Sequence, residues 1–176
     1  MDAGTKHQTH KLREFTTQLA EKLKAAPNMP VQPLRLAVRA GTESYLLDMA
    51  TAGEIVTTAD IAPVPWTRPW YRGLTNVRGR LIGVVDLQEL SGRAPLGPEQ
   101  SQQILVFGPA LKVNAGILIS RAFGLRNIRE LQELGATNNA ALPWEMQRYR
   151  DLDGTVLTEL DLPRLVAAEV FSSVGI

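Results

Sequence analysis

The sequence is informative first through the residue types that it lacks. It contains no cysteine, so it can form no disulfide and can carry out no thiol catalysis. It also has no Asn-X-Ser/Thr sequon, and the two absences together favour a reducing, intracellular setting. No apolar run approaches the ~18 residues of a membrane span, and the polar N-terminus has no signal-peptide core. We therefore expect a cytoplasmic protein without direct membrane insertion.

The chain is also nearly neutral, contains only two histidines and lacks the common catalytic motifs. Nineteen basic and eighteen acidic residues leave a formal charge of +1, which argues against a large nucleic-acid footprint. The two histidines, His7 and His10, have no third ligand at a suitable spacing, so no metal site is predicted. Neither a Gly-X-Ser-X-Gly elbow nor a phosphate-binding glycine loop is present. The sequence thus predicts no catalytic residue and no cofactor.

The chain instead reads as one helix followed by many short strands. Residues 10–26 carry apolar side chains at three- and four-residue steps, which predicts an amphipathic helix within an N-terminal extension over residues 1–30. This helix could pack on the body of the protein or serve in docking or oligomerisation. Apolar segments separated by Gly and Pro then predict a series of strands. These cover residues 34–39, 44–49, 54–58, 81–85, 104–107 and 117–119.

Residues 70–90 are the most informative segment. They read as a glycine-hinged loop that carries Arg72, Asn76, Arg78 and Arg80 and leads into the apolar strand at 81–85. Because that strand has no polar interruption, we expect it to be covered on both faces. Polar groups at the mouth of a buried strand have a rigid support, which suits a binding surface. The segment therefore indicates contact with a partner rather than chemistry.

Two interpretations of Arg78 stay open. Asn76 and Gly79 suit a tight turn around it, since glycine adopts backbone conformations that other residues resist. An arginine held there can bind a carboxylate on a partner, or it can brace its own fold, for example through Glu54. Strand alternation alone places Glu54 on the outer face of its strand.

A basic and aromatic cluster precedes this segment. Its members are Trp66, Arg68, Trp70, Tyr71 and Arg72. Such clusters can stack nucleobases, which makes a small nucleic-acid-binding β-barrel the alternative function. The same residues can also fill a barrel or anchor a protein interface, and the nearly neutral charge favours this second interpretation.

The chain also contains an internal echo. Residues 79–90 (GRLIGVVDLQEL) and 154–165 (GTVLTELDLPRL) share four identities in twelve positions without a gap. Each segment reads as glycine, strand, aspartate and the apolar start of a helix. Asp86 and Asp161 are therefore predicted to be helix N-caps rather than a catalytic carboxylate pair. The echo predicts two similar all-β lobes, each closed by a short helix.

Taken together, these motifs resemble the CheW-like adaptor family, most closely its PilI-like branch, which serves type IV pili and twitching motility. The matching segments are residues 54–56, 63–65, 70–73, 76–79 and 84–87, within a resemblance that covers 34–171. It implies an all-β fold of two five-stranded SH3-like barrels over residues 31–176, with a short C-terminal helix. It also implies a non-enzymatic role, in which the protein couples the cytoplasmic tip of a methyl-accepting chemoreceptor to a CheA-type histidine kinase at receptor arrays.

The resemblance implies a partner-binding set, and the chain departs from the family pattern in several places, among them Ala52, where the family usually has valine. The set is Glu54, Arg72, Asn76, Arg78 and Arg80. Where the family often has an aspartate after a strand of the second lobe, this chain has Ser120, followed by Arg121-Ala122-Phe123. The glycine expected before the final hairpin is missing around residues 147–150.

Overall fold

The structure is a computed structural model that describes residues 34–57, 60–100 and 103–176. The chain divides into two units, Met1–Gln32 and Pro33–Ile176, and the described residues all belong to the second unit. The helix predicted over residues 10–26 lies outside the described part. Among the helices of the described residues, none has both the length and the apolar character needed to cross a membrane.

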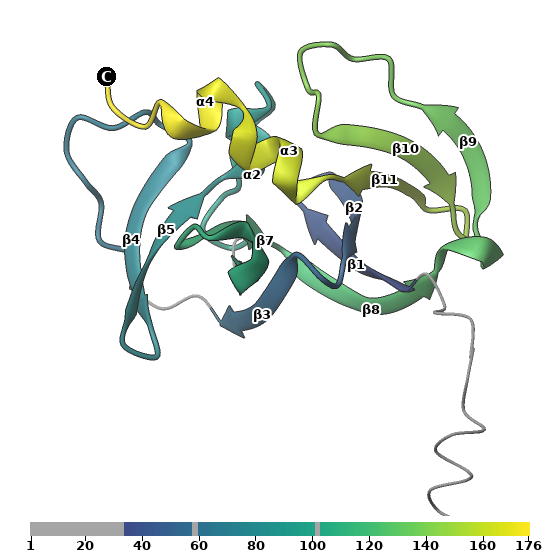
Figure 1. Cartoon of the computed structure of the whole chain (residues 1–176), viewed down its shortest axis with the longest axis horizontal. Helices are drawn as coiled ribbons and strands as arrows, with labels where there is room; N and C mark the ends of the chain where they lie inside the picture. The colour runs from purple at the N-terminus through teal and green to yellow at the C-terminus, as the bar shows by residue number, and fades with distance from the viewer. Residues whose placement is uncertain (1–33, 58–59, 101–102) are drawn as a thin grey trace, which may run out of the picture. The chain divides into compact units, whose positions relative to one another are not determined.

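The described residues form two mixed β-sheets with a few short helices (Figure 1). The six-stranded sheet has the order β8 (Arg121–Asn127), β1 (Leu34–Ala40), β2 (Glu43–Asp48), β11 (Val156–Leu160), β10 (Glu145–Arg150) and β9 (Gln132–Ala136). The five-stranded sheet has the order β3 (Ala52–Thr57), β6 (Gln103–Phe107), β7 (Ala115–Ile119), β5 (Arg80–Val85) and β4 (Tyr71–Val77). The mostly β fold is as predicted, and one sheet has a strand more than the family's five.

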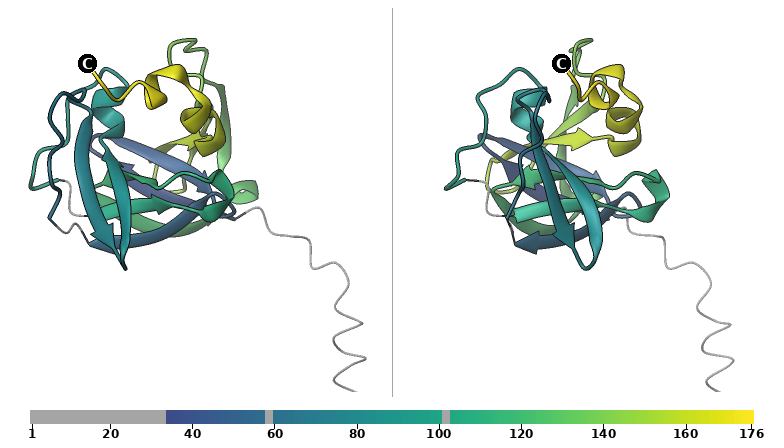
Figure 2. Two further views of the ribbon diagram at one scale, coloured as in Figure 1. Left: turned by 60° about the vertical axis from the view of Figure 1, so that its left-hand side comes forward. Right: turned by 90° about the vertical axis from the view of Figure 1, so that its left-hand side faces the viewer.

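Short helices and 3₁₀ turns connect the strands. They are α2 (Leu87–Leu90), η1 (Pro109–Leu111), η2 (Ile128–Glu130), α3 (Leu162–Ala167) and α4 (Glu169–Ser172). Helices α2, α3 and α4 lie at the same end of the strands, as the views from three directions show (Figures 1 and 2). The short C-terminal helix that the resemblance implied is therefore present as α3, continued by α4.

The internal echo is confirmed and extends further than the sequence showed. Strand β5 pairs with β7 in parallel and leads through Asp86 into α2; β11 pairs with β2 in parallel and leads through Asp161 into α3. Both aspartates cap their helices as predicted. In addition, the Asp86 N–H donates to the Trp70 carbonyl, and the Asp161 N–H donates to the Trp144 carbonyl, each at 2.8 Å. Each lobe thus fixes its strand-to-helix corner with a buried tryptophan.

Alternating strand residues build three apolar clusters. One lies within the five-stranded sheet: Val77, Ile82, Val84, Leu96, Ile104, Val106 and Leu118. Another lies within the six-stranded sheet, where Ala37, Leu46 and Leu157 are joined by Phe123, Leu131 and Tyr149. The largest cluster draws on both sheets, for example on Leu36, Leu47, Leu105 and Ile117. Because successive side chains point to opposite faces, each inner strand supplies both its own lobe and this shared core.

The prediction that residues 70–80 form a loop is wrong. Tyr71–Val77 forms β4, paired in antiparallel register with β5, and the turn consists of Arg78 and Gly79 alone. Their φ angles of 51° and 83° match the two-residue turn that suits the twist of a hairpin. Glycine and asparagine made the segment resemble a loop, although Gly73, Thr75 and Val77 are buried in a period of two.

Two further expectations need correction. Leu81 is 61% exposed, so β5 is covered on both faces only from Ile82 onward. Strands β8, β9 and β10 were not predicted, because their polar, half-exposed sequences lack an apolar run. The six strands that were predicted differ from the observed ones by no more than two residues at either end.

The two N-caps differ in burial, which predicts different costs of removal. Asp86 is fully buried, and its carboxylate accepts the N–H groups of Gln88, Glu89 and Leu96 at 3.0, 3.3 and 2.8 Å. Asp161 accepts one backbone N–H, that of Arg164, at 2.9 Å. We expect Asp86→Ala to lower the free energy of unfolding by about 3 kcal/mol, since buried donors lose their acceptor.

Asp161→Ala serves as the matched control, with an expected loss of about 1 kcal/mol. Urea unfolding of both variants measures the difference. Equal losses of unfolding free energy in the two variants would show that the hydrogen bond from the Leu96 N–H to Asp86 adds nothing beyond capping.

Candidate functional site

The tip of the β4–β5 hairpin brings Glu54, Asn76 and Arg78 together. The Asn76 Oδ1 accepts the Gly79 N–H at 2.8 Å and so closes the turn. The Arg78 guanidinium contacts the Glu54 carboxylate, with Nη2 and Oε2 3.1 Å apart. The Arg78 side chain nevertheless remains 82% exposed, whereas that of Glu54 is 33% exposed. The hairpin therefore holds Arg78 in place while presenting it to solvent.

The Glu54–Arg78 ion pair also joins the two ends of the five-stranded sheet. Glu54 belongs to β3, which is one edge strand, and Arg78 follows β4, which is the other. The internal brace that the sequence left open is therefore present. An ion pair as exposed as this one stabilises a protein by at most about 1 kcal/mol. Its structural contribution is thus small enough to leave room for a second role.

Arg80 and Arg72 lie in different surroundings. Arg80 pairs in register with Val77 on the same hairpin, is exposed, and forms no ion pair with any residue that the structure describes. Arg72 lies at the opposite end of β4, where its Nη2 donates to the Leu96 carbonyl at 2.9 Å and its Nη1 lies 3.6 Å from Glu89. The structure thus gathers four of the five predicted residues at one tip and separates Arg72.

The basic and aromatic cluster at residues 66–72 is divided between core and surface. Trp70 is 6% exposed and packs in the shared core, with the half-buried Tyr71 edge-on to it. Trp66 and Arg68 remain exposed, and the Arg68 Nε donates to the Ser173 carbonyl at 3.2 Å. Since Trp70 is buried and Tyr71 is half-buried, the cluster does not form a continuous platform for nucleobases.

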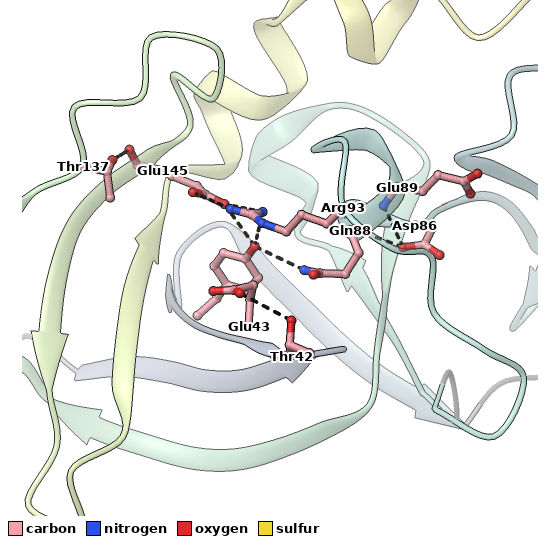
Figure 3. A network of polar contacts seen from close by, with 9 residues as sticks. Thr42, Glu43, Asp86, Gln88, Glu89, Arg93, Thr137 and Glu145 are labelled. Carbon is pink, nitrogen blue, oxygen red and sulfur yellow. Dashed lines mark hydrogen bonds and ion pairs between the residues drawn. The ribbon is translucent and has the colours of Figure 1, made fainter.

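A polar network at the junction of the two sheets was not found from the sequence (Figure 3). Arg93, which follows α2, donates through Nη2 to Glu145 Oε2 of β10 at 3.0 Å, and its Nη1 lies 2.8 Å from Oε1. The Tyr45 hydroxyl of β2 donates to Glu145 Oε1 at 3.1 Å. It accepts from Arg93 Nη1 at 3.1 Å and from Gln88 Nε2 at 3.4 Å. This hydroxyl therefore uses all of its hydrogen-bonding capacity.

Burial determines the electrostatics of this network. It raises the pKa of Tyr45 strongly, and the Glu145 carboxylate adds to that rise. Burial alone would lower the pKa of Arg93, but the hydrogen bond to Glu145 and nearby negative charge give a net rise. A neutral phenol therefore lies against an ion pair whose carboxylate is buried and whose arginine is 28% exposed. The partners lie 52 and 100 residues apart in sequence, which is why no local pattern indicates them.

Comparisons with known proteins identify the family of this chain. The family model for the CheW-like domain matches residues 35–170. The chain belongs to the CheW-like domain family. The chemotaxis protein CheW of Thermotoga maritima is 27% identical over 125 residues, which cover 70% of this chain and 81% of that protein. The protein PilI of Pseudomonas aeruginosa is 28% identical over 92 residues, which cover 52% of this chain and 51% of PilI.

A solved structure supports the CheW-like fold. The scaffolding protein TtCheW from Thermoanaerobacter tengcongensis superposes with a TM-score of 0.65 at 18% identity, covering 80% of this chain and 96% of that one. The match with PilI spans only about half the length of that protein. In the described part of the chain, no group of three or more His, Cys, Asp or Glu side chains could hold a metal ion. His7 and His10 lie outside that part.

The network predicts a strong coupling between Arg93 and Glu145. Arg93→Gln leaves a buried carboxylate without its cation, so we expect it to cost about 3 kcal/mol or more of unfolding free energy. Arg93→Met combined with Glu145→Met should cost less than the sum of the single changes, because no charge is left unpaired. Urea unfolding measures all three variants.

Arg164→Gln is the matched control, because it breaks the exposed ion pair between Arg164 and Asp161. That change should stay within about 0.5 kcal/mol. If the double variant loses as much unfolding free energy as the two single variants together, the predicted coupling between Arg93 and Glu145 is contradicted.

The raised pKa of Tyr45 predicts that the protein loses stability in alkali through this side chain. A group with a raised folded pKa stabilises the fold below its unfolded pKa, here 10.0, and this contribution is lost as the pH rises above that value. We expect the wild type to lose stability more steeply above pH 10.0 than Tyr45→Phe. Denaturant unfolding across this pH range, compared between the two proteins, provides the measurement, and parallel curves would contradict the prediction.

Proposed function

We propose that this protein is a non-enzymatic adaptor that couples the cytoplasmic tip of a methyl-accepting chemoreceptor to a CheA-type histidine kinase. Membership of the CheW-like family supports this role, and the similarity to PilI supports a type IV pilus and twitching-motility pathway. The observation that carries the proposal is Arg78, exposed yet fixed at the tip of a two-residue turn. The protein would act at membrane-associated receptor arrays through its partners.

The hairpin tip suits recognition of an acidic group. Glu54 engages one nitrogen of the Arg78 guanidinium, so further donors remain available for a carboxylate on the partner. Arg80 adds a second positive charge, and Leu81, which is 61% exposed, adds apolar area beside it. A charged group next to an apolar contact is the usual make-up of an interface anchor.

The adaptor role itself is geometric. Such a protein must keep receptor and kinase in a fixed relation, so that a change in one alters the other. The Arg93–Glu145 pair supports this role by holding the segment that follows α2 against β10 of the six-stranded sheet. A single micromolar contact supplies only about −8 kcal/mol, so an array needs several contacts acting together.

We propose no nucleic-acid partner. Of the cluster at residues 66–72, Trp70 is buried and Arg72 is held by Leu96 and Glu89. The formal charge of +1 also leaves little attraction for a phosphate backbone.

A pull-down with the CheA-type kinase encoded by the same genome tests the proposal. We expect the wild type to capture the kinase and Arg78→Glu to lose capture, because the reversed charge repels an acidic group on the partner. The thermal midpoint of the variant should be nearly unchanged, since the exposed ion pair contributes at most about 1 kcal/mol. Arg129→Glu, at an exposed arginine of η2, is the matched control and should still capture the kinase.

The charge swap that combines Glu54→Arg with Arg78→Glu separates the two roles of Arg78. Recovery of capture would mean that Arg78 acts through Glu54, as a positioning residue. Continued loss would support direct contact with the partner. Failure of the wild type to capture either the kinase or a receptor-tip fragment would refute the adaptor function.

A further inference from the structure

We propose that Arg39 and Arg121 form a binding site for a carboxylate carried by an extended, acidic segment of a partner protein. Arg39 of β1 and Arg121 of β8 are direct cross-strand neighbours in the antiparallel register. Like charges in this relation repel one another, so an isolated fold gains nothing from the pair. An anion placed between the two guanidinium groups would convert the repulsion into two charge-assisted contacts.

A shared aromatic ring positions both guanidinium groups. The Cζ atoms of Arg39 and Arg121 lie 5.2 and 5.7 Å from the centre of the Phe123 ring. Phe123 in turn packs on the apolar cluster of Ala37, Leu46 and Leu157. The ring is thus anchored inside its lobe, and stacking on it restricts where the two charges can lie.

Ser120 fixes the backbone on both sides of the pair. Its N–H donates to the Arg39 carbonyl at 2.7 Å, and its Oγ accepts the Gly41 N–H at 3.1 Å. These two bonds tie the start of β8 to the turn after β1. The two arginines therefore face each other because of the backbone, not because of a chance side-chain conformation.

No carboxylate among the described residues lies within ion-pair distance of Arg39 or Arg121. A cavity of 110 Å³ beside Arg39 is lined by two acidic groups, Asp151 and Asp153, and both already have partners. Asp151 binds Arg126 with Nε and Oδ2 2.7 Å apart, and Asp153 accepts the Thr155 N–H at 2.9 Å. Two positive charges therefore remain unneutralised on a rigid support.

The position of β8 indicates an extended protein segment as the occupant. β8 is an end strand of the six-stranded sheet, with β1 as its one strand neighbour among the described residues. An edge strand offers unpaired backbone groups to an added strand. Leu125, 48% exposed on the same strand, offers apolar contact nearby. The low net charge of the chain favours a single carboxylate contact over a long polyanion.

This site is independent of the proposed adaptor contact. Arg39 and Arg121 belong to the six-stranded sheet, whereas Arg78 belongs to the hairpin of the five-stranded sheet. Loss of kinase capture in Arg78→Glu and loss of carboxylate binding at Arg121 can therefore be observed separately.

The test is an NMR titration of the full, isotopically labelled chain with hexaglutamate as the probe. We expect saturable shifts at the side-chain Nε–H groups of Arg39 and Arg121 and along the β8 backbone. Arg39→Gln and Arg121→Gln should each weaken binding by about tenfold, as expected for the loss of one charge-assisted contact. Arg129→Gln, at an exposed arginine outside the site, should bind like the wild type.

Arg121→Glu provides a second readout that does not depend on a ligand. It places a carboxylate opposite Arg39 within the chain, so it should abolish hexaglutamate binding and raise the thermal midpoint above that of the wild type. Shifts spread equally over all exposed arginines would overturn the site. Tighter binding of oligothymidylate or inorganic phosphate at the same residues would overturn the assignment to an acidic protein segment.

Discussion

The contact between Arg93 and Glu145, with the Tyr45 hydroxyl against both, fixes the segment that follows α2 against β2 and β10 of the six-stranded sheet. A buried ion pair is costly to desolvate and still more costly to break, so it tolerates only one relative placement of its partners. Apolar packing in the shared core supplies most of the driving force but little direction. The polar network adds direction, because its hydrogen bonds fix where the segment after α2 lies against the six-stranded sheet.

With the sheets held in this way, the surface positions acquire fixed relations to one another. The strand faces are used twice, once for the interior of each lobe and once for the shared core, so little of the inner strands remains for recognition. Polar groups suited to binding are left at turns and sheet edges. The Arg78–Gly79 turn and the edge strand β8 are two such places, one on each sheet.

The sequence predicted much of the fold and part of the candidate site. Apolar runs located six strands, and the echo correctly indicated Asp86 and Asp161 as caps. The prediction of a loop before Gly79 was wrong, because Gly73 and Asn76 look like turn residues even when they lie within a strand. Strands β8, β9 and β10 were not predicted from the sequence because their residues are largely polar. A half-exposed strand needs few apolar side chains.

What the sequence determined by itself is local: the two helix caps, the Arg78–Gly79 turn and the alternation that divides each inner strand between two cores. These features depend on neighbours a few residues away, whose chemistry can be read in order along the chain. Only the tertiary structure decided that Glu54 meets Arg78, that Arg39 faces Arg121 and that Arg93 meets Glu145. Those contacts depend on which strands become neighbours, and that choice follows from the burial of apolar surface summed over the whole domain.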